Sequence, residues 1–197
     1  MELRKELESY TPWNAQEEAD RAQFLRLLSC PDIYTRDNLS AHFSASSWVV
    51  SPDRQQVLLI YHKIYNSWGW MGGHADGEKD LLGVALRETR EESGLEHIQL
   101  VSPGIFSLET LTVDGHEKHG QYVPSHLHLN VTYLLEADPK EPVRIKPDEN
   151  SAIGWFPVEQ IANKVTEPWM QARIYDKLIA KVQGMQNERR NTWNFCL

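Results

Sequence analysis

Two patterns of hydrophobic and polar positions alternate along the chain. Short runs rich in β-branched and aromatic residues predict strands, and stretches with an apolar residue every three or four positions predict amphipathic helices. The runs place strands at residues 46–50, 57–61, 105–113, 126–135 and 153–156. A Ser-Pro-Asp turn at 51–53 joins the first two, which predicts an early antiparallel pair.

Helical signals lie toward both ends of the chain. Asn14 followed three positions later by Glu17 is a capping pattern, and apolar residues then recur at helical spacing until Pro31 stops them. A last helix is expected to open at Pro168, where proline suits the first turn, and its apolar stripe continues to Val182. We expect both helices to pack an apolar face on the core.

A third helix, expected over residues 81–93, stands in the middle of the chain. Asp80 is its predicted N-cap, and Gly94 suits the left-handed residue that ends a helix. A glycine-rich loop is expected before it at 68–77, and a long polar loop at 114–124. The pattern as a whole predicts a mixed α/β fold with a strand-rich core and helices at both ends.

Composition narrows the class of protein. The chain has 197 residues, 41% of them hydrophobic and 24% charged, which is typical of one globular domain with a possible extension. The net charge of −8 argues against nonspecific DNA or RNA binding, because phosphate contacts need a basic surface. Cys30 and Cys196 are too few for a disulfide framework, and neither a signal peptide nor a membrane span is visible. We therefore expect a cytoplasmic protein.

The middle helix carries the chemistry. Glu88, Glu91 and Glu92 stand at positions i, i+3 and i+4, so their carboxylates share one helix face. Arg87 precedes Glu91 by four residues and can pair with it. Most acidic helix faces are simply solvated. The glycines just before this helix change that balance, because Gly73 and its neighbours let backbone approach a ligand, and Mg²⁺ prefers oxygen ligands.

Residues 73–95 resemble the box of the Nudix hydrolase family, G-x5-E-x7-R-E-U-x-E-E-x-G-U, where U is aliphatic. With Gly73 as the first glycine, Arg87-Glu88, Glu91-Glu92, Gly94 and Leu95 fall in register. The flanks at 68–73 and 154–159 also resemble the family, so the resemblance extends from about residue 43 to 161.

Three positions depart from the family pattern. The first box glutamate is replaced by Lys79, with Glu78 and Asp80 on either side as possible substitutes, so no metal role is assigned there. Met71 stands where the family has a proline, and Thr89 stands at the aliphatic position. The three glutamates of the helix are intact.

The resemblance implies an α/β/α sandwich with a mixed sheet. On this basis residues 1–41 are expected to form an N-terminal helical extension and residues 42–197 the Nudix hydrolase domain. The implied activity is Mg²⁺-dependent cleavage of a diphosphate linkage in a nucleoside diphosphate derivative, with Mn²⁺ as a possible substitute. The metal binds phosphate oxygens and activates water. The implied metal ligands are the carbonyl of Gly73 and the carboxylates of Glu88, Glu91 and Glu92.

The resemblance also suggests roles in catalysis. Glu91 and Glu92 are expected to act in catalysis, Glu91 as a ligand or base, and Arg87 to orient a glutamate. Some family members take the base from a loop outside the box. Glu149 is our first candidate for that base and Glu117 the second, although each considered alone resembles an ordinary surface glutamate.

Several side chains are candidates for binding the substrate. His126 and His128 stand two apart on a predicted strand and so face the same side, where they either contact substrate or are buried against backbone. Tryptophans near the box either stack on a base or pack in the core. The residues expected to line the substrate site are His74, Trp70, His126 and His128, with Trp68, Tyr65 and Asn66 in the same approach.

Two rival functions stay open at this point. The first is a Nudix fold that senses a nucleotide without turnover, which the Lys79 departure allows. The second is a prenyl-diphosphate isomerase, which the positions of Cys30 and Cys196 outside the box disfavour. The expected partner is a small phosphorylated molecule of the nucleotide type, with no nucleic-acid polymer, no membrane and a homodimer as an option. Substrate identity is left open by the residues.

Overall fold

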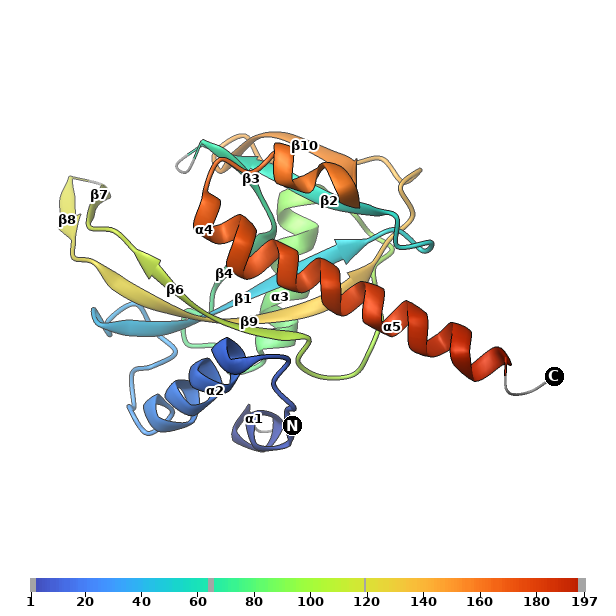
Figure 1. Cartoon of the computed structure of the whole chain (residues 1–197). Helices are drawn as coiled ribbons and strands as arrows, with labels where there is room; N and C mark the ends of the chain where they lie inside the picture. The colour runs from blue at the N-terminus through green and yellow to red at the C-terminus, as the bar shows by residue number, and fades with distance from the viewer. Residues whose placement is uncertain (1–2, 64–65, 119, 195–197) are drawn as a thin grey trace.

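A mixed sheet separates two layers of helices (Figure 1). The computed structural model describes residues 3–63, 66–118 and 120–194. Within these residues the sheet has eight strands, and its main path runs in the order β10-β2-β1-β9-β5, while β3 pairs with β2, β4 with β1 and β6 with β9. The strands are β1 (Ala41–Val50), β2 (Gln56–His62), β3 (Ser67–Gly69), β4 (Met71–His74), β5 (Gln99–Leu100), β6 (Ser107–Val113), β9 (His126–Glu136) and β10 (Asn150–Pro157).

The long strands β1 and β9 form the parallel centre of the sheet. Their register pairs His42 with His128 and continues to Val50 opposite Glu136. The other strand pairs are antiparallel, including the expected pair of β1 and β2, in which Val50 faces Val57. The parallel centre requires a long connection between β1 and β9, and that connection contains the helix with the carboxylates.

One helix layer is α3 (Leu81–Ser93), and the other is α4 (Pro168–Met170), the π-helical segment η2 (Gln171–Tyr175) and α5 (Asp176–Asn194). Alternate residues of β1 serve the two layers, as strand geometry requires. Phe43 and Ala45 join the core under α3, whereas Trp48 and Val50 join a second core under α5. The fold is therefore the expected α/β/α sandwich.

The N-terminal helices α1 (Leu3–Ser9) and α2 (Ala15–Leu27) pack below β6 and β9 (Figure 1). Asn14 caps α2 as expected, because its side chain accepts a hydrogen bond from the backbone N–H of Glu17 at 2.9 Å. The strongly charged beginning of the chain did not predict α1. Its only buried residues are Leu3 and Leu7, whose i, i+4 spacing gives a helix of seven residues an apolar edge.

Two expected loops contain strands. The segment expected as a glycine-rich loop at 68–77 includes β3 and β4, and the segment expected as a polar loop at 114–124 forms the hairpin of β7 (His116–Lys118) and β8 (Gln121–Val123). These predictions were wrong because glycine and polar residues carry little strand propensity of their own. Pairing with β1 and β2, or with each other, supplies the strand geometry instead.

The other predicted elements agree with the structure to within a few residues at their ends. The helix at 81–93 has the expected bounds, with Asp80 as N-cap and Gly94 in the left-handed conformation at φ 74°. The last helix begins at Pro168 as expected. β1 begins five residues before the expected strand, because His42 and Ser44 interrupt the apolar pattern. Among the described helices, none is long and apolar enough to cross a lipid bilayer.

Candidate active site

The site begins where the glycines of β4 pass over the face of α3. The backbone N–H of Gly72 donates a hydrogen bond of 2.9 Å to Glu92 Oε2. Gly73 lies so close to Glu88 that a Cβ at this position would be 2.5 Å from the carboxyl carbon. A side chain at this position would displace the Glu88 carboxylate from where it lies. Two carboxylates of α3 are thus in direct contact with the backbone that the sequence analysis proposed as part of a cation site.

Glu92 is the most deeply buried of the three glutamates, with 2% of its surface exposed. Burial raises its pKa to about 8, an effect that the nearby Glu149 and Glu88 increase and that the Gly72 N–H opposes. Burial also raises the pKa of Glu88, and Glu91 adds to that increase. A carboxylate in such a place gains most from a positive charge, because desolvation penalises its ionised form.

Arg87 pairs with three carboxylates of the box, one that precedes α3 and two that lie on it. Its guanidinium lies 2.5 Å from Glu78 Oε2, 3.3 Å from Glu88 Oε1 and 3.9 Å from Glu91 Oε1. These hydrogen bonds, that to Glu78 above all, raise the pKa of Arg87. These ion pairs hold the guanidinium among the three carboxylates.

The neighbours of Lys79 have other partners. Glu78 binds Arg87, and Asp80 Oδ1 accepts the backbone N–H of Gly83 at 3.0 Å as the helix cap. Both neighbours of Lys79 thus have partners within the protein, and no metal role is assigned to either. Lys79 itself is exposed and lines a separate hollow beside α1.

The loop before β10 adds one more carboxylate to the cluster. Lys146 Nζ lies 3.2 Å from Glu91 Oε2 and 2.8 Å from Glu149 Oε1, so it joins these two side chains. Desolvation lowers the pKa of Lys146, but its hydrogen bonds to Glu149 and Glu91 outweigh that and raise it. The neighbouring Asn150 donates from Nδ2 to the backbone carbonyl of Glu92 at 3.2 Å and ties the loop to α3.

Glu149 thus stands beside the box, whereas Glu117 does not. Glu117 lies on β7, in a hairpin that extends away from α3 (Figure 1). Of the two candidate bases outside the box, the structure brings only Glu149 to the carboxylates.

A comparison with protein families identifies the domain to which these elements belong. The family model described as NUDIX domain matches residues 41–178. The chain belongs to the NUDIX domain family. The family and the intact glutamates of the Nudix box make the protein a pyrophosphohydrolase.

Solved structures support the Nudix fold. An Ap4A hydrolase from C. elegans in a binary complex is 18% identical, with a TM-score of 0.53, over 74% of this chain and 98% of that one. A MutT protein from Methanosarcina mazei Go1 is 17% identical, with a TM-score of 0.53, over 74% and 95%. The E. coli dihydroneopterin triphosphate pyrophosphohydrolase is 14% identical, with a TM-score of 0.53, over 70% and 94%. No curated protein sequence matches significantly.

The expected substrate residues fall into two groups in this Nudix domain. His74, His126 and His128 lie together, and the sequence analysis missed His42, which joins them. The only signal for His42 in the sequence was the alternation of His42 and Ser44 along a strand. Two alternating residues are too few to distinguish a site from chance. Their side chains leave the sheet on the face opposite α3, since His74 follows Gly73 on β4 and successive side chains alternate.

The tryptophans beside the Nudix box pack against other aromatic rings. Trp70 is 7% exposed and lies 5.6 Å, ring centre to ring centre, from Tyr175 in the core under α5. Trp68 makes edge contacts with Tyr61 at 5.5 Å and Phe156 at 4.6 Å. Such surroundings favour a packing role for Trp70 and leave little of its ring for a base. Tyr65 and Cys196 lie outside the described residues, and Asn66 accepts a hydrogen bond from Tyr61.

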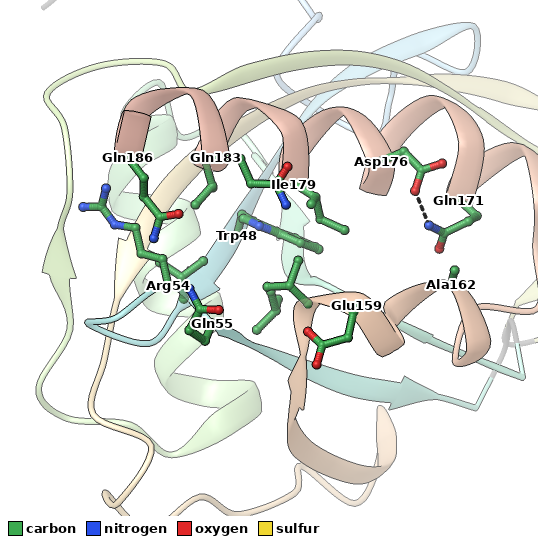
Figure 2. A pocket seen from close by; sticks show the side chains of 14 residues that line it. Trp48, Arg54, Gln55, Glu159, Ala162, Gln171, Asp176, Ile179, Gln183 and Gln186 are labelled. Atoms are coloured by element: carbon green, nitrogen blue, oxygen red, sulfur yellow. Dashed lines mark hydrogen bonds between the residues drawn. The ribbon is translucent and has the colours of Figure 1, made fainter. Parts of the chain in front are cut away.

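A cavity of about 310 Å³ opens on the other side of the Nudix sheet, between η1 (Val158–Asn163) and α5 (Figure 2). Its wall includes Trp48, Arg54, Glu159 and Gln186. Among the residues that the structure describes, none of those predicted for the site is in its lining. The chemistry of the Nudix box is therefore at the surface of α3 and not in this cavity.

Proposed function

We propose that this Nudix protein is a Mg²⁺-dependent hydrolase that cleaves a diphosphate linkage in a nucleoside diphosphate derivative or a similar nucleotide. The observation that carries the proposal is the buried carboxylate of Glu92, which is held by the Gly72 N–H with Glu88 beside it. The charge of Lys146 also acts on Glu92, but this lysine is paired with Glu91 and Glu149, and burial outweighs its effect on the pKa of Glu92. An added cation would neutralise Glu92 directly.

The donor set fits a hard divalent cation. It combines carboxylate oxygens on one rigid helix face with a backbone strand that glycine brings to within contact of Glu88. Glu88 and Glu92 would be the main ligands, with Glu91 and the carbonyl of Gly73 completing the set. The bound Mg²⁺, or Mn²⁺ in its place, would supply charge neutralisation for the phosphates and an acidified water.

The residues around the cluster would orient the metal ligands and accept a proton. Arg87 holds Glu88 and Glu91 in place through its ion pairs. Glu149 and Glu91 share Lys146, which holds both carboxylates beside the box. We propose Glu149 as the general base that takes the proton from the attacking water, with Glu91 as the alternative.

The nucleotide class of the substrate is supported by two arguments. The net charge of −8 repels phosphates at long range, so a cation bound at the box would favour the binding of a phosphorylated substrate. The named structural relatives include a hydrolase of Ap4A and a pyrophosphohydrolase of dihydroneopterin triphosphate. In each of these two substrates a heterocycle is linked to phosphates. We further propose a cytoplasmic enzyme, without a nucleic-acid polymer or membrane as partner, that is able to form a homodimer.

The test is a panel of nucleoside diphosphate derivatives, dinucleoside polyphosphates and nucleoside triphosphates, with release of phosphate or mononucleotide measured in Mg²⁺. The variant Glu92→Gln keeps the acceptor for the Gly72 N–H but removes the charge, and we expect kcat to fall about 10²- to 10⁴-fold. The matched control is Glu96→Gln, an exposed position just after the box. Equal turnover by the parent and Glu92→Gln would refute the catalytic assignment.

The same panel separates the enzyme from a nucleotide sensor. A sensor would bind one of the compounds in calorimetry and release no product with Mg²⁺ or Mn²⁺. That result would replace the proposed hydrolase by a binding module.

A further inference from the structure

A cluster of histidines lies on the sheet face opposite the carboxylates. His42 on β1 is in register with His128 on β9, and His74 on β4 is opposite Ser44, one position along the same face. The ring centre of His42 lies 5.2 Å from that of His74 and 5.0 Å from that of His128. The ring centres of His74 and His128 are 4.8 Å apart. Three strands therefore bring three imidazoles to one place.

The ring nitrogens point toward one another. Nε2 of His128 lies 3.2 Å from Nε2 of His74 and also 3.2 Å from Nε2 of His126. A neutral imidazole nitrogen carries either one proton or one lone pair, so His128 Nε2 has a good hydrogen bond for only one of these neighbours. Protons alone therefore do not explain the convergence.

His42 supplies an independent observation. Its side chain is 4% exposed, and its Nε2 is a buried atom without a hydrogen-bond partner. Its other nitrogen, Nδ1, lies 3.1 Å from the carbonyl oxygen of Asn38. A carbonyl only accepts, so Nδ1 carries the proton and Nε2 keeps a buried lone pair.

His126 has the same arrangement. Its Nδ1 donates to the carbonyl oxygen of Pro124 at 2.8 Å, which leaves the lone pair on the Nε2 that faces His128. A backbone carbonyl on the outer nitrogen is the usual partner of a metal-bound histidine, because it fixes the tautomer and the direction of the ring.

We propose that His42, His74 and His128 bind a transition-metal ion of the Zn²⁺ class through one ring nitrogen each. The candidate ligand atoms of these three residues all lie within 4.8 Å of one another. Zinc–nitrogen bonds of about 2.0–2.1 Å in a tetrahedron place the nitrogens about 3.3 Å apart, close to the 3.2 Å between His74 and His128. His126 or a water completes the fourth position.

This site differs in chemistry from the Nudix cluster. Imidazole nitrogens suit zinc and related metals, whereas the carboxylates of α3 suit Mg²⁺. His74 and His128 are only partly buried, so an ion has a path to the cluster. The two sites meet on β4, where His74 follows Gly73. An ion on His74 would fix this four-residue strand and, with it, the glycine backbone against Glu88 and Glu92.

A metal bound to His74 and His128 would also change the role first expected of them. A nitrogen whose lone pair is on a metal does not accept a hydrogen bond from substrate. In this site the histidines hold β4 in place and do not contact the nucleotide.

The test uses tag-free full-length protein stripped with a chelator and then titrated with Zn²⁺ or Co²⁺ alone, in excess Mg²⁺. We expect about one equivalent to bind, with the visible spectrum of tetrahedral Co²⁺. X-ray absorption of the unmodified protein should show at least three imidazoles around the metal. An oxygen-only shell, or binding well below one equivalent, overturns the proposal.

Variants locate the site. His74→Asn and His128→Asn change partly exposed positions and should weaken Zn²⁺ binding about 100-fold or more, since each removes a ligand. His97→Asn is the matched control, because the His97 side chain is 87% exposed and lies outside the cluster. The double variant Glu88→Gln with Glu92→Gln should keep its equivalent of zinc. Loss of zinc in that variant, or retention in both histidine variants, would assign the ion to the Nudix box instead.

Discussion

Buried glutamates occur in two regions of this molecule, and their surroundings differ in one respect. On α3, Glu92 is buried beside Glu88, and Lys146, whose charge acts on Glu92, is paired with Glu91 and Glu149. Between the N-terminal helices and α5, Glu17 and Glu109 are fully buried and face the ammonium groups of Lys177 and Lys181. In the first region the lysine is paired with other carboxylates and the pKa of Glu92 stays raised, whereas in the second region two lysines contact the buried carboxylates themselves.

The ion pairs of the second region are close. Lys177 Nζ lies 2.9 Å from Glu109 Oε1 and 3.2 Å from Glu17 Oε1, and Lys181 Nζ lies 2.9 Å from Glu17 Oε1. Burial raises the pKa of Glu17, but the two lysines and the Tyr10 hydroxyl outweigh burial and lower it to about 2. This network connects α2, β6 and α5, so it holds the terminal helices on the sheet.

The comparison indicates how a structural carboxylate differs from one that awaits a ligand. Both kinds are desolvated, and desolvation alone penalises the charged form. A carboxylate in contact with a cation of the fold has a lowered pKa, as in Glu17. One without such a contact has a raised pKa, as in Glu92, whose pKa is about 8. The difference points to α3 as the place for an external metal.

The largest effect on stability is expected from breaking the buried network. Glu17→Gln leaves Lys177 and Lys181 with too little negative charge in a desolvated place, and should lower the free energy of unfolding by about 3–5 kcal/mol. Urea unfolding of the variant and the parent measures this. Glu18→Gln is the control, because the Glu18 side chain is 60% exposed and pairs only with Arg21 at 3.0 Å in the described contacts. Similar losses in the two variants would show that the network is not stabilising.

Acid should affect the same network next. The pKa of Glu17 is about 2 in the folded protein and 4.5 ordinarily, so its contribution is present above pH 4.5 and lost as the pH falls toward 2. We expect the melting temperature of the parent to fall over this range, and that of Glu17→Gln to fall less steeply. Parallel curves for the two proteins would mean that other groups control acid unfolding.

The smallest effect has the opposite sign. The pKa of Glu92 is raised to about 8 in the fold, so the metal-free protein has its full contribution below pH 4.5 and loses it as the pH rises through 8. Glu92→Gln should therefore stabilise the metal-free protein at pH 8 by about 1–3 kcal/mol. Added Mg²⁺ should stabilise the parent and not the variant. Destabilisation by this substitution without metal would remove the contrast between the two regions.

Local signals in the sequence were sufficient for much of the site. Asp80 and Gly94 mark the ends of α3 through short-range capping, and helical spacing places Glu88, Glu91 and Glu92 on one face without any tertiary information. The same local logic related Arg87 to Glu91. It did not show that Arg87 also binds Glu78, which precedes the helix.

Long-range pairing was beyond the sequence. The strands β3 and β4 exist because they pair with β2 and β1, and their own glycines argue against strand structure. The histidine cluster likewise depends on the register of β1 with β9, which joins residues 86 positions apart, His42 and His128. No local periodicity contains that register.

The sequence by itself determined the family, the helix of the Nudix box and the face on which its glutamates gather, because these follow from spacing along one element. Only the tertiary structure decided which carboxylates are buried, which of them form ion pairs with a lysine, and which histidines cluster together. Burial and charge pairing depend on contacts between distant segments, and these set the free energy of each ionised group. Glu17 and Glu92 are the same residue type on helices, and the fold alone gives them opposite pKa shifts.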